Sequence, residues 1–202
     1  MTQPKTLFEM AGVNTSLPPL DSVSVVLIDM QMEYLDGLLP LPGAKAALAE
    51  AASLLRLARD AGRPVIHIQH QGRAGGIFDP AGAGFRLADP VTPQGPETVL
   101  TKGLPNAFTG TELDAVLKSS GAKQIVVGGF MTHMCVSSTV RAALDRGYGA
   151  VVVASACGTR DLPDGRGGVV SAETLHTVEL AALADRFALI APNAAALSPK
   201  PR

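Results

Sequence analysis

The sequence predicts an α/β protein, a three-layer α/β/α sandwich built on a mainly parallel, six-stranded, Rossmann-like sheet. Short runs of apolar, β-branched residues alternate along the chain with segments of helical periodicity, which is the order of strand–helix–strand units. These runs are continuously apolar, as in strands that are buried on both faces of a parallel sheet. The length of 202 residues suits one domain with a single large core.

The first half of the chain contains three predicted strands and one predicted helix. The predicted strands are residues 23–28, 64–69 and 97–102, the first of them nearly continuously apolar. Along residues 43–61, apolar residues recur at intervals of 4, 3, 4 and 3, which places them on one helix face. Gly62 then ends the helix. The residues on that face are Ala47, Ala51, Leu54, Ala58 and Ala61.

The second half continues the alternation with three helices and three strands. Thr109 is a candidate cap for a helix over residues 109–119, and a strand follows at residues 124–130. A helix over residues 135–147 carries its apolar residues on one side, and a strand at residues 150–154 follows it. A helix over residues 172–185 and a strand at residues 187–190 complete the predicted sheet.

Two segments lie outside this pattern. Residues 1–21 are polar and contain several prolines, so they predict an N-terminal arm, and residues 22–202 predict a single domain without repeats or linkers. Residues 70–96 are too rich in Gly and Pro for a helix or a strand. Such a long loop in a compact domain is usually functional.

The composition limits the partners and the compartment. Lys and Arg number 17 against 18 Asp and Glu, and a net charge of −1 argues against a nucleic-acid partner. No uncharged apolar run is long enough to predict a membrane span. Two cysteines and the lack of a signal-peptide pattern predict a cytoplasmic protein without a disulfide framework. With 47% hydrophobic and 17% charged residues, a homodimer or homotetramer is expected.

Three chemically complementary residues follow or end predicted strands. Sites in open parallel sheets lie beyond the carboxyl ends of the strands, where Asp29, Lys102 and Cys135 fall. Cys135 is expected to begin a helix, where unpaired N–H groups and the helix dipole favour an anion, and Lys102 nearby would lower the thiol pKa further. Asp29 would bind the ammonium or accept a proton. Cys157 has no such placement and is expected in the core.

Three runs of residues carry a family resemblance. They are Leu27-Ile28-Asp29-Met30-Gln31, the run from Lys102-Gly103 to Asn106-Ala107-Phe108, and Gly128-Gly129-Phe130-Met131-Thr132-His133-Met134-Cys135-Val136. Together they resemble the amidohydrolase branch of the isochorismatase-like cysteine hydrolase superfamily, which includes nicotinamidases and N-carbamoylsarcosine amidase. The resemblance covers about residues 22–190. It implies the isochorismatase fold and hydrolysis of a C–N bond in a small amide, carbamoyl (ureido) or lactam substrate through a thioester.

The resemblance also implies roles for individual residues. Cys135 matches the nucleophile, Asp29 the general base, and Lys102 the cation between them. A non-proline cis peptide is implied between Phe130 and Met131, which would direct the backbone N–H groups of Met131 and Cys135 at one oxyanion. Neighbouring residues are expected to line the substrate pocket, with His133 facing either the substrate or a subunit interface. These pocket residues are Gln31, Tyr34, Phe108, Phe130 and His133.

No metal and no cofactor are predicted. Nicotinamidases use an Asp-x-His metal motif, which the stretch from His67 to Gly72 lacks, and His67 and His70 are spaced so as to point to opposite faces of a strand. An isochorismatase-type vinyl-ether hydrolase stays an alternative, although such enzymes lack the nucleophilic cysteine. Further alternatives are a non-catalytic binding protein on the same fold and a nucleotide-binding protein, which the absence of a glycine fingerprint after the first strand disfavours.

Overall fold

A parallel six-stranded sheet forms the centre of the molecule in the computed structural model, which describes residues 3–198. The strand order is β3-β2-β1-β4-β5-β8, and every neighbouring pair is parallel. The predicted fold class is therefore confirmed. The strands are β1 (Val23–Ile28), β2 (Val65–His70), β3 (Thr98–Lys102), β4 (Gln124–Phe130), β5 (Gly149–Gly158) and β8 (Leu189–Ala191).

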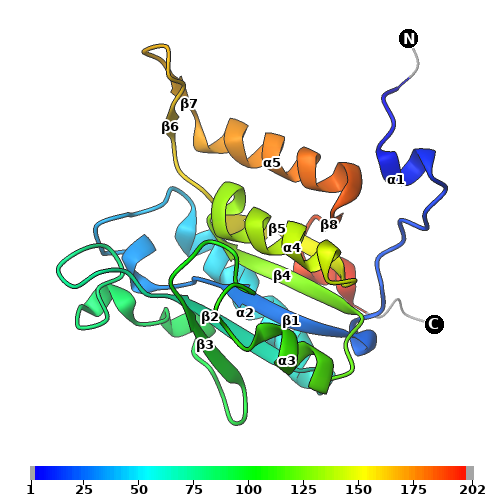
Figure 1. The fold of residues 1–202 in the computed structure, drawn as a ribbon, viewed down its shortest axis with the longest axis horizontal. Coiled ribbons are helices and arrows are strands. Elements are labelled where there is room, and N and C mark those ends of the chain that lie inside the picture. Colours follow the sequence, from blue (N-terminus) through cyan, green and yellow to red (C-terminus); the bar gives the residue numbers. More distant parts are fainter. Residues whose placement is uncertain (1–2, 199–202) are drawn as a thin grey trace.

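Helices cover both faces of the sheet (Figure 1). Helix α2 (Ala44–Asp60) packs on one face, where its apolar side chains meet Val25 and Leu27 of β1. Helices α3 (Leu113–Ser119), α4 (Ser137–Asp145) and α5 (Ala172–Arg186) lie on the other face, where Val26 and Ile28 of β1 point. Strand β1 is buried on both sides, and its residues other than Ser24 are apolar without alternation. Within residues 3–198, no helix has the length and apolarity that crossing a bilayer requires.

Three predicted boundaries differ from the structure by more than two residues. Strand β5 continues to Gly158 instead of ending at residue 154. Helix α3 begins at Leu113, because Thr109 lies in a turn and Leu113 N donates to the hydroxyl of Thr111. The helix expected from residue 135 begins earlier, as a wide π turn over Thr132–Val136 that continues into α4.

Short elements were not predicted. In the N-terminal arm, α1 (Leu7–Met10) begins with a capping box at Thr6, and Leu7 N donates to the carboxylate of Asp185 at the end of α5. Strands β6 (Leu162–Pro163) and β7 (Val169–Val170) form an antiparallel hairpin that projects from the body of the protein (Figure 1). Single 3-10 turns complete the structure at Leu20–Ser22, Met32–Tyr34, Ala83–Phe85, Asp89–Val91 and Ala194–Leu197.

One side of α5 is left uncovered by the described chain. Leu183 is the buried residue of this helix, whereas Val178 is 59% exposed. Val169 in the neighbouring hairpin is 70% exposed. Apolar side chains on an outward face are typical of surfaces that meet another protein chain.

We expect a second copy of the chain to cover this side of α5. Sedimentation velocity at micromolar concentration should then give at least twice the 20.8 kDa mass of one chain. Val178→Glu should shift the population towards the monomer, because it places a charge in the expected interface. Leu104→Glu, at an exposed residue beyond β3 on the opposite edge of the sheet, serves as the matched control. A 20.8 kDa species alone in the wild type would contradict the expectation.

Candidate active site

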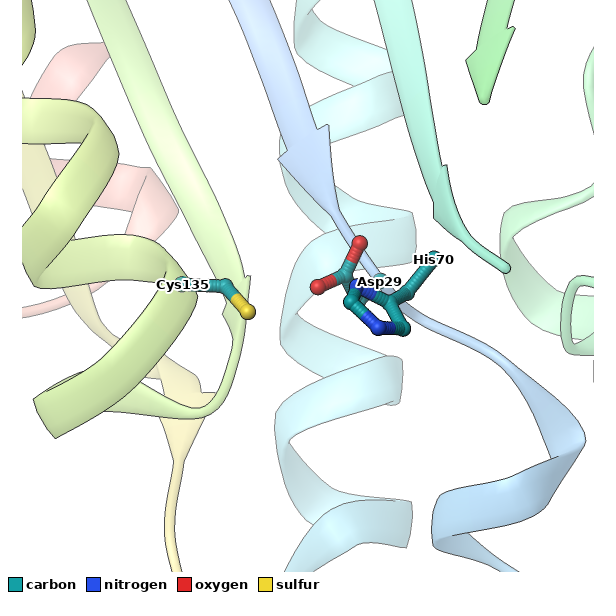
Figure 2. Close-up of side chains that lie close together, drawn as sticks. All are labelled: Asp29, His70 and Cys135. Atoms are coloured by element: carbon teal, nitrogen blue, oxygen red, sulfur yellow. The ribbon is translucent and has the colours of Figure 1, made fainter. Parts of the chain in front are cut away.

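The Lys102 ammonium lies at the centre of a buried polar cluster. Its Nζ is 2.7 Å from Asp29 Oδ2, 2.9 Å from His70 Nδ1 and 3.3 Å from Cys135 Sγ. An ammonium only donates, so these contacts use all three of its N–H groups. Because His70 Nδ1 accepts one of them, the neutral imidazole carries its proton on Nε2. Figure 2 shows how the side chains of Asp29, His70 and Cys135 converge.

Four neighbouring strands supply this cluster. Lys102 and His70 are the last residues of β3 and β2, and they are register partners. Asp29 directly follows β1, and Cys135 lies in the turn that follows β4. The connections leave β1 and β4 in opposite directions along the sheet, and ligands of open parallel sheets bind at such a point.

The backbone is unusually close where β1 and β4 end. Gly129 has φ of 140°, and a Cβ at this position would overlap the carbonyl oxygen of Ile28. Only glycine fits here, so Gly129 lets the segment carrying Cys135 approach β1. Asp29 has φ of 53°, a left-handed conformation that aspartate tolerates better than most residues, and its N–H donates to Ile68 O at 2.9 Å.

In the turn after β4, the N–H of Cys135 makes no hydrogen bond to the carbonyl of Met131. The carbonyl of Met131 accepts from Met134 N at 3.0 Å and from Val136 N at 3.3 Å, whereas Cys135 N, between them, makes no such bond to it. The peptide bond between Phe130 and Met131 is cis, at the place that the resemblance implies. The turn therefore carries the Cys135 thiol and a backbone donor at the same residue.

Helix α5 holds this turn through polar contacts. His176 Nδ1 lies 2.8 Å from Thr132 Oγ1, and the Glu179 carboxylate accepts from the hydroxyl of Ser137. Arg141 also reaches Glu179, at 3.1 Å. His133, on the same turn, bonds to the hydroxyl of Thr159 at the end of β5. These contacts fix the orientation of the turn.

Burial and neighbouring charges shift the pKa values of the cluster. Burial raises the pKa of Asp29 to about 6, although the Lys102 charge opposes the shift. Burial, followed by the negative charge of Asp29, raises the pKa of Cys135 to about 12, against the attraction of Lys102. Burial and the Lys102 charge lower the pKa of His70 to about 4. The predicted lowering of the thiol pKa was therefore wrong, because desolvation outweighs the favourable charges.

The predicted pocket residues have different positions. Tyr34 packs edge-on against Phe130 at 5.3 Å between ring centroids, and both are buried. Burial, followed by the negative charge of Asp29, raises the pKa of the Tyr34 phenol. Phe108 does not reach the site, because it stacks on Tyr148 beneath Arg146, at the end of α4 away from Cys135. The chain turns away from Lys102 before it reaches Phe108.

Gln31 has a supporting position. Its side-chain amide accepts from His70 N and donates to the carbonyls of His70 and Phe85. These bonds use the amide on backbone groups and join the ends of β1 and β2 to the long loop. In the same loop, Phe78 packs edge-on against His70 and Tyr34, each at 5.1 Å between centroids. The loop therefore packs directly over the site.

Two residues near the site were not assigned from the sequence. His70 ends β2 at the same edge as Lys102, but its contact with Nζ depends on the reach of two side chains. Arg160 lies just beyond β5, and its charge acts on both Tyr34 and His133. Its Nε is buried and has no hydrogen-bond partner within residues 3–198. Their position at or just after strand ends on one edge is the sequence signal that both share.

Asp29, His70 and Cys135 are also residue types that bind metals. One ligand atom of each lies within 4.8 Å of the others. The Lys102 ammonium, however, lies between these atoms and contacts all three side chains.

Lys102 should affect the reactivity of the Cys135 thiol. Lys102→Ala removes the positive charge that opposes the rise of the thiol pKa, so alkylation of Cys135 by iodoacetamide should require higher pH than in the wild type. Lys102→Arg should not restore the wild-type profile, because a planar guanidinium does not replace a compact ammonium. Mass spectrometry of the labelled peptides measures the rate at each pH, with Cys157 as the internal control. Coincident profiles for the wild type and Lys102→Ala would contradict this role.

Comparison with known proteins finds similar sequences and similar structures. Residues 23–194 match the Isochorismatase domain family. The crystal structure of an isochorismatase from Pseudomonas putida KT2440 superimposes with a TM-score of 0.91 at 43% identity, covering 96% of this chain and 100% of that chain. A secreted isochorismatase effector of Verticillium dahliae is 37% identical over 179 residues, which are 88% of this chain and 92% of that protein.

A third relative, less similar to this chain than the first two, is named after an amide substrate. The maleamate amidohydrolase of Pseudomonas putida is 32% identical over 154 residues, covering 68% of this chain and 72% of that protein. The family match and these identities confirm the resemblance carried by the three sequence runs. The chain belongs to the isochorismatase family of hydrolases.

Proposed function

We propose that this protein is a cysteine-dependent hydrolase that cleaves a C–N bond in a small amide, carbamoyl or lactam substrate through a thioester. The observation that carries the proposal is the buried contact of one ammonium, Lys102, with both a carboxylate and a thiol. The relationship to a maleamate amidohydrolase supports the reaction class. A free-thiol nucleophile also suits the cytoplasmic location expected from the sequence.

The first step is attack by Cys135. Its raised pKa makes it a thiol at neutral pH, so the proton has to leave as Sγ bonds to the substrate carbonyl carbon. Asp29 is ionised at neutral pH, and its Oδ1 is buried without a partner among the described residues, so this oxygen is available for the proton. The negative charge then moves from Asp29 to the substrate. Lys102 touches both residues and therefore offsets the charge before and after the transfer.

The second part of the reaction reverses the proton movement. The backbone N–H groups of Met131 and Cys135 are the proposed donors to the tetrahedral oxyanion; such a donor typically contributes roughly 100–1000-fold in rate. Collapse breaks the C–N bond, and Asp29 returns its proton to the leaving amine or ammonia. Water, losing a proton to Asp29, then attacks the thioester, the C–S bond breaks, and Cys135 recovers its thiol as the acid product forms.

A vinyl-ether hydrolase or a binding protein would explain fewer of the contacts in the cluster of Asp29, Lys102 and Cys135. Hydrolysis of a vinyl ether forms no acyl thioester and gives the Cys135 thiol no role. A purely binding protein would gain nothing from an ammonium buried against a carboxylate and a thiol, since burial of charge is costly.

Separate substitutions of Cys135 and Asp29 test the catalytic roles assigned to them. In a screen of primary amides, ureido compounds and lactams for released ammonia or amine, Cys135→Ala should abolish turnover and Cys157→Ala should leave it unchanged. Asp29→Asn should lower turnover by about 100–10,000-fold, because both proton transfers use this carboxylate. In the wild type, kcat/KM should fall below a pH of about 6, where Asp29 binds a proton and no longer accepts one. Full activity of Cys135→Ala, or cleavage of isochorismate alone, would refute the proposal.

Arg160 suggests an acidic group in the substrate. Arg160 directly follows Thr159, the hydrogen-bond partner of His133, and its buried Nε has no partner among the described residues. Carboxylates pair with such a group. Arg160→Met should raise KM for an amide that bears a carboxylate by about 10–100-fold, as expected for a charged hydrogen bond. It should leave KM unchanged for the neutral analogue of the same amide. Arg146→Met, at the far end of α4, is the control. Equal effects on both substrates would exclude this contact.

A further inference from the structure

We infer that Asp29, His70 and Cys135 form a three-ligand site for a divalent metal ion, and that the ammonium of Lys102 occupies this site and excludes metal from the intact protein. The inference uses the geometry of the cluster and does not depend on the proposed reaction.

The ligand atoms surround one point. A carboxylate oxygen, an imidazole nitrogen and a thiol sulfur lie within 4.8 Å of one another, and Lys102 Nζ lies between them at 2.7, 2.9 and 3.3 Å. Zinc binds oxygen and nitrogen at about 2.0–2.2 Å and sulfur at about 2.3 Å. Each ligand atom would therefore move inward by only about 1 Å to hold a metal at the position of Nζ.

The donor set suits a zinc-like ion. One oxygen, one nitrogen and one sulfur ligand match the preferences of Zn²⁺ and Co²⁺, and three protein ligands leave a fourth position open. Asp29 also offers a second oxygen, Oδ1, which is buried and unpartnered among the described residues.

Lys102 keeps a metal out by occupancy and by charge. Its side chain is completely buried, and its ammonium contacts all three ligand residues. A dication beside it would be repelled strongly in a poorly hydrated interior. Without the lysine, the buried carboxylate and the thiol are left without a cation, and a metal ion would supply one.

Cobalt titration tests the inference. Lys102→Ala should bind one Co²⁺ per chain, with a thiolate-to-cobalt charge-transfer band in the near ultraviolet, and added Zn²⁺ should abolish the band. The wild type should show no such band. Lys102→Ser is the second variant, should the alanine variant lose its folded circular dichroism spectrum.

Double variants identify the ligands. Lys102→Ala with Cys135→Ala should lose the charge-transfer band, whereas Lys102→Ala with Cys157→Ala should keep it. Lys102→Ala with His70→Ala should bind cobalt more weakly by at least the roughly 10–100-fold that loss of an outer-shell contact costs. A folded Lys102 variant without the band would overturn the inference.

The wild-type protein provides an independent measurement. Equimolar Zn²⁺ should leave the rate of Cys135 alkylation unchanged, because Lys102 occupies the site. Protection of Cys135 by Zn²⁺ in the wild type would overturn the inference even if no Lys102 variant folds. None of these readouts uses turnover, so they stand or fall separately from the proposed hydrolysis.

Discussion

A single buried ammonium constrains the functional edge of the sheet. Removing a charge from water costs several kcal/mol unless hydrogen bonds and an opposite charge compensate for it. Lys102 meets this requirement with three acceptors that come from three other segments of the chain. Loss of one member of such a buried set typically costs about 3–5 kcal/mol, so the cluster also constrains the fold. The ends of β1, β2 and β3 and the turn after β4 have to lie where this one side chain reaches them.

The surrounding structure maintains that arrangement from two sides. Gly129 allows the turn after β4 to approach β1, and Gln31 joins the ends of β1 and β2 to the loop above them. From the other side, α5 contributes few buried apolar side chains but bonds to Thr132 and Ser137 next to the nucleophile. The role of α5 within one chain is therefore to orient this turn more than to fill the core.

The parts of the fold that depend on hydrophobic periodicity could be predicted from the sequence. Continuous apolar strands and the face of α2 are clear, whereas the last four residues of β5 are not, because Ser155 to Gly158 lack β-branched side chains. The one-turn helix α1 and the two-residue strands β6 and β7 are too short for any period to show.

Of the candidate site, the sequence could predict only the residues that lie at the ends of predicted strands. Asp29, Lys102 and Cys135 follow from the rule that parallel sheets place function at one edge. The contact of His70 with Lys102 depends on side-chain reach, and the pKa of Cys135 depends on burial, neither of which can be read along the chain. Phe108 was wrongly predicted to line the pocket, because closeness in sequence to Lys102 does not determine the direction in which the chain turns.

The distribution of the cluster over four strands also affects how the protein acquires its site during folding. The contacts of Lys102 with Asp29 and Cys135 span 73 and 33 residues, so they form only after distant segments have met. Closing such long loops costs chain entropy, and parallel sheets assemble slowly for that reason. The charge of Lys102 stays hydrated until β1 to β4 lie in order, because an incomplete sheet offers it no buried set of acceptors. The fully bonded ammonium therefore requires all of these segments, and no fragment of the chain that ends before β4 contains it.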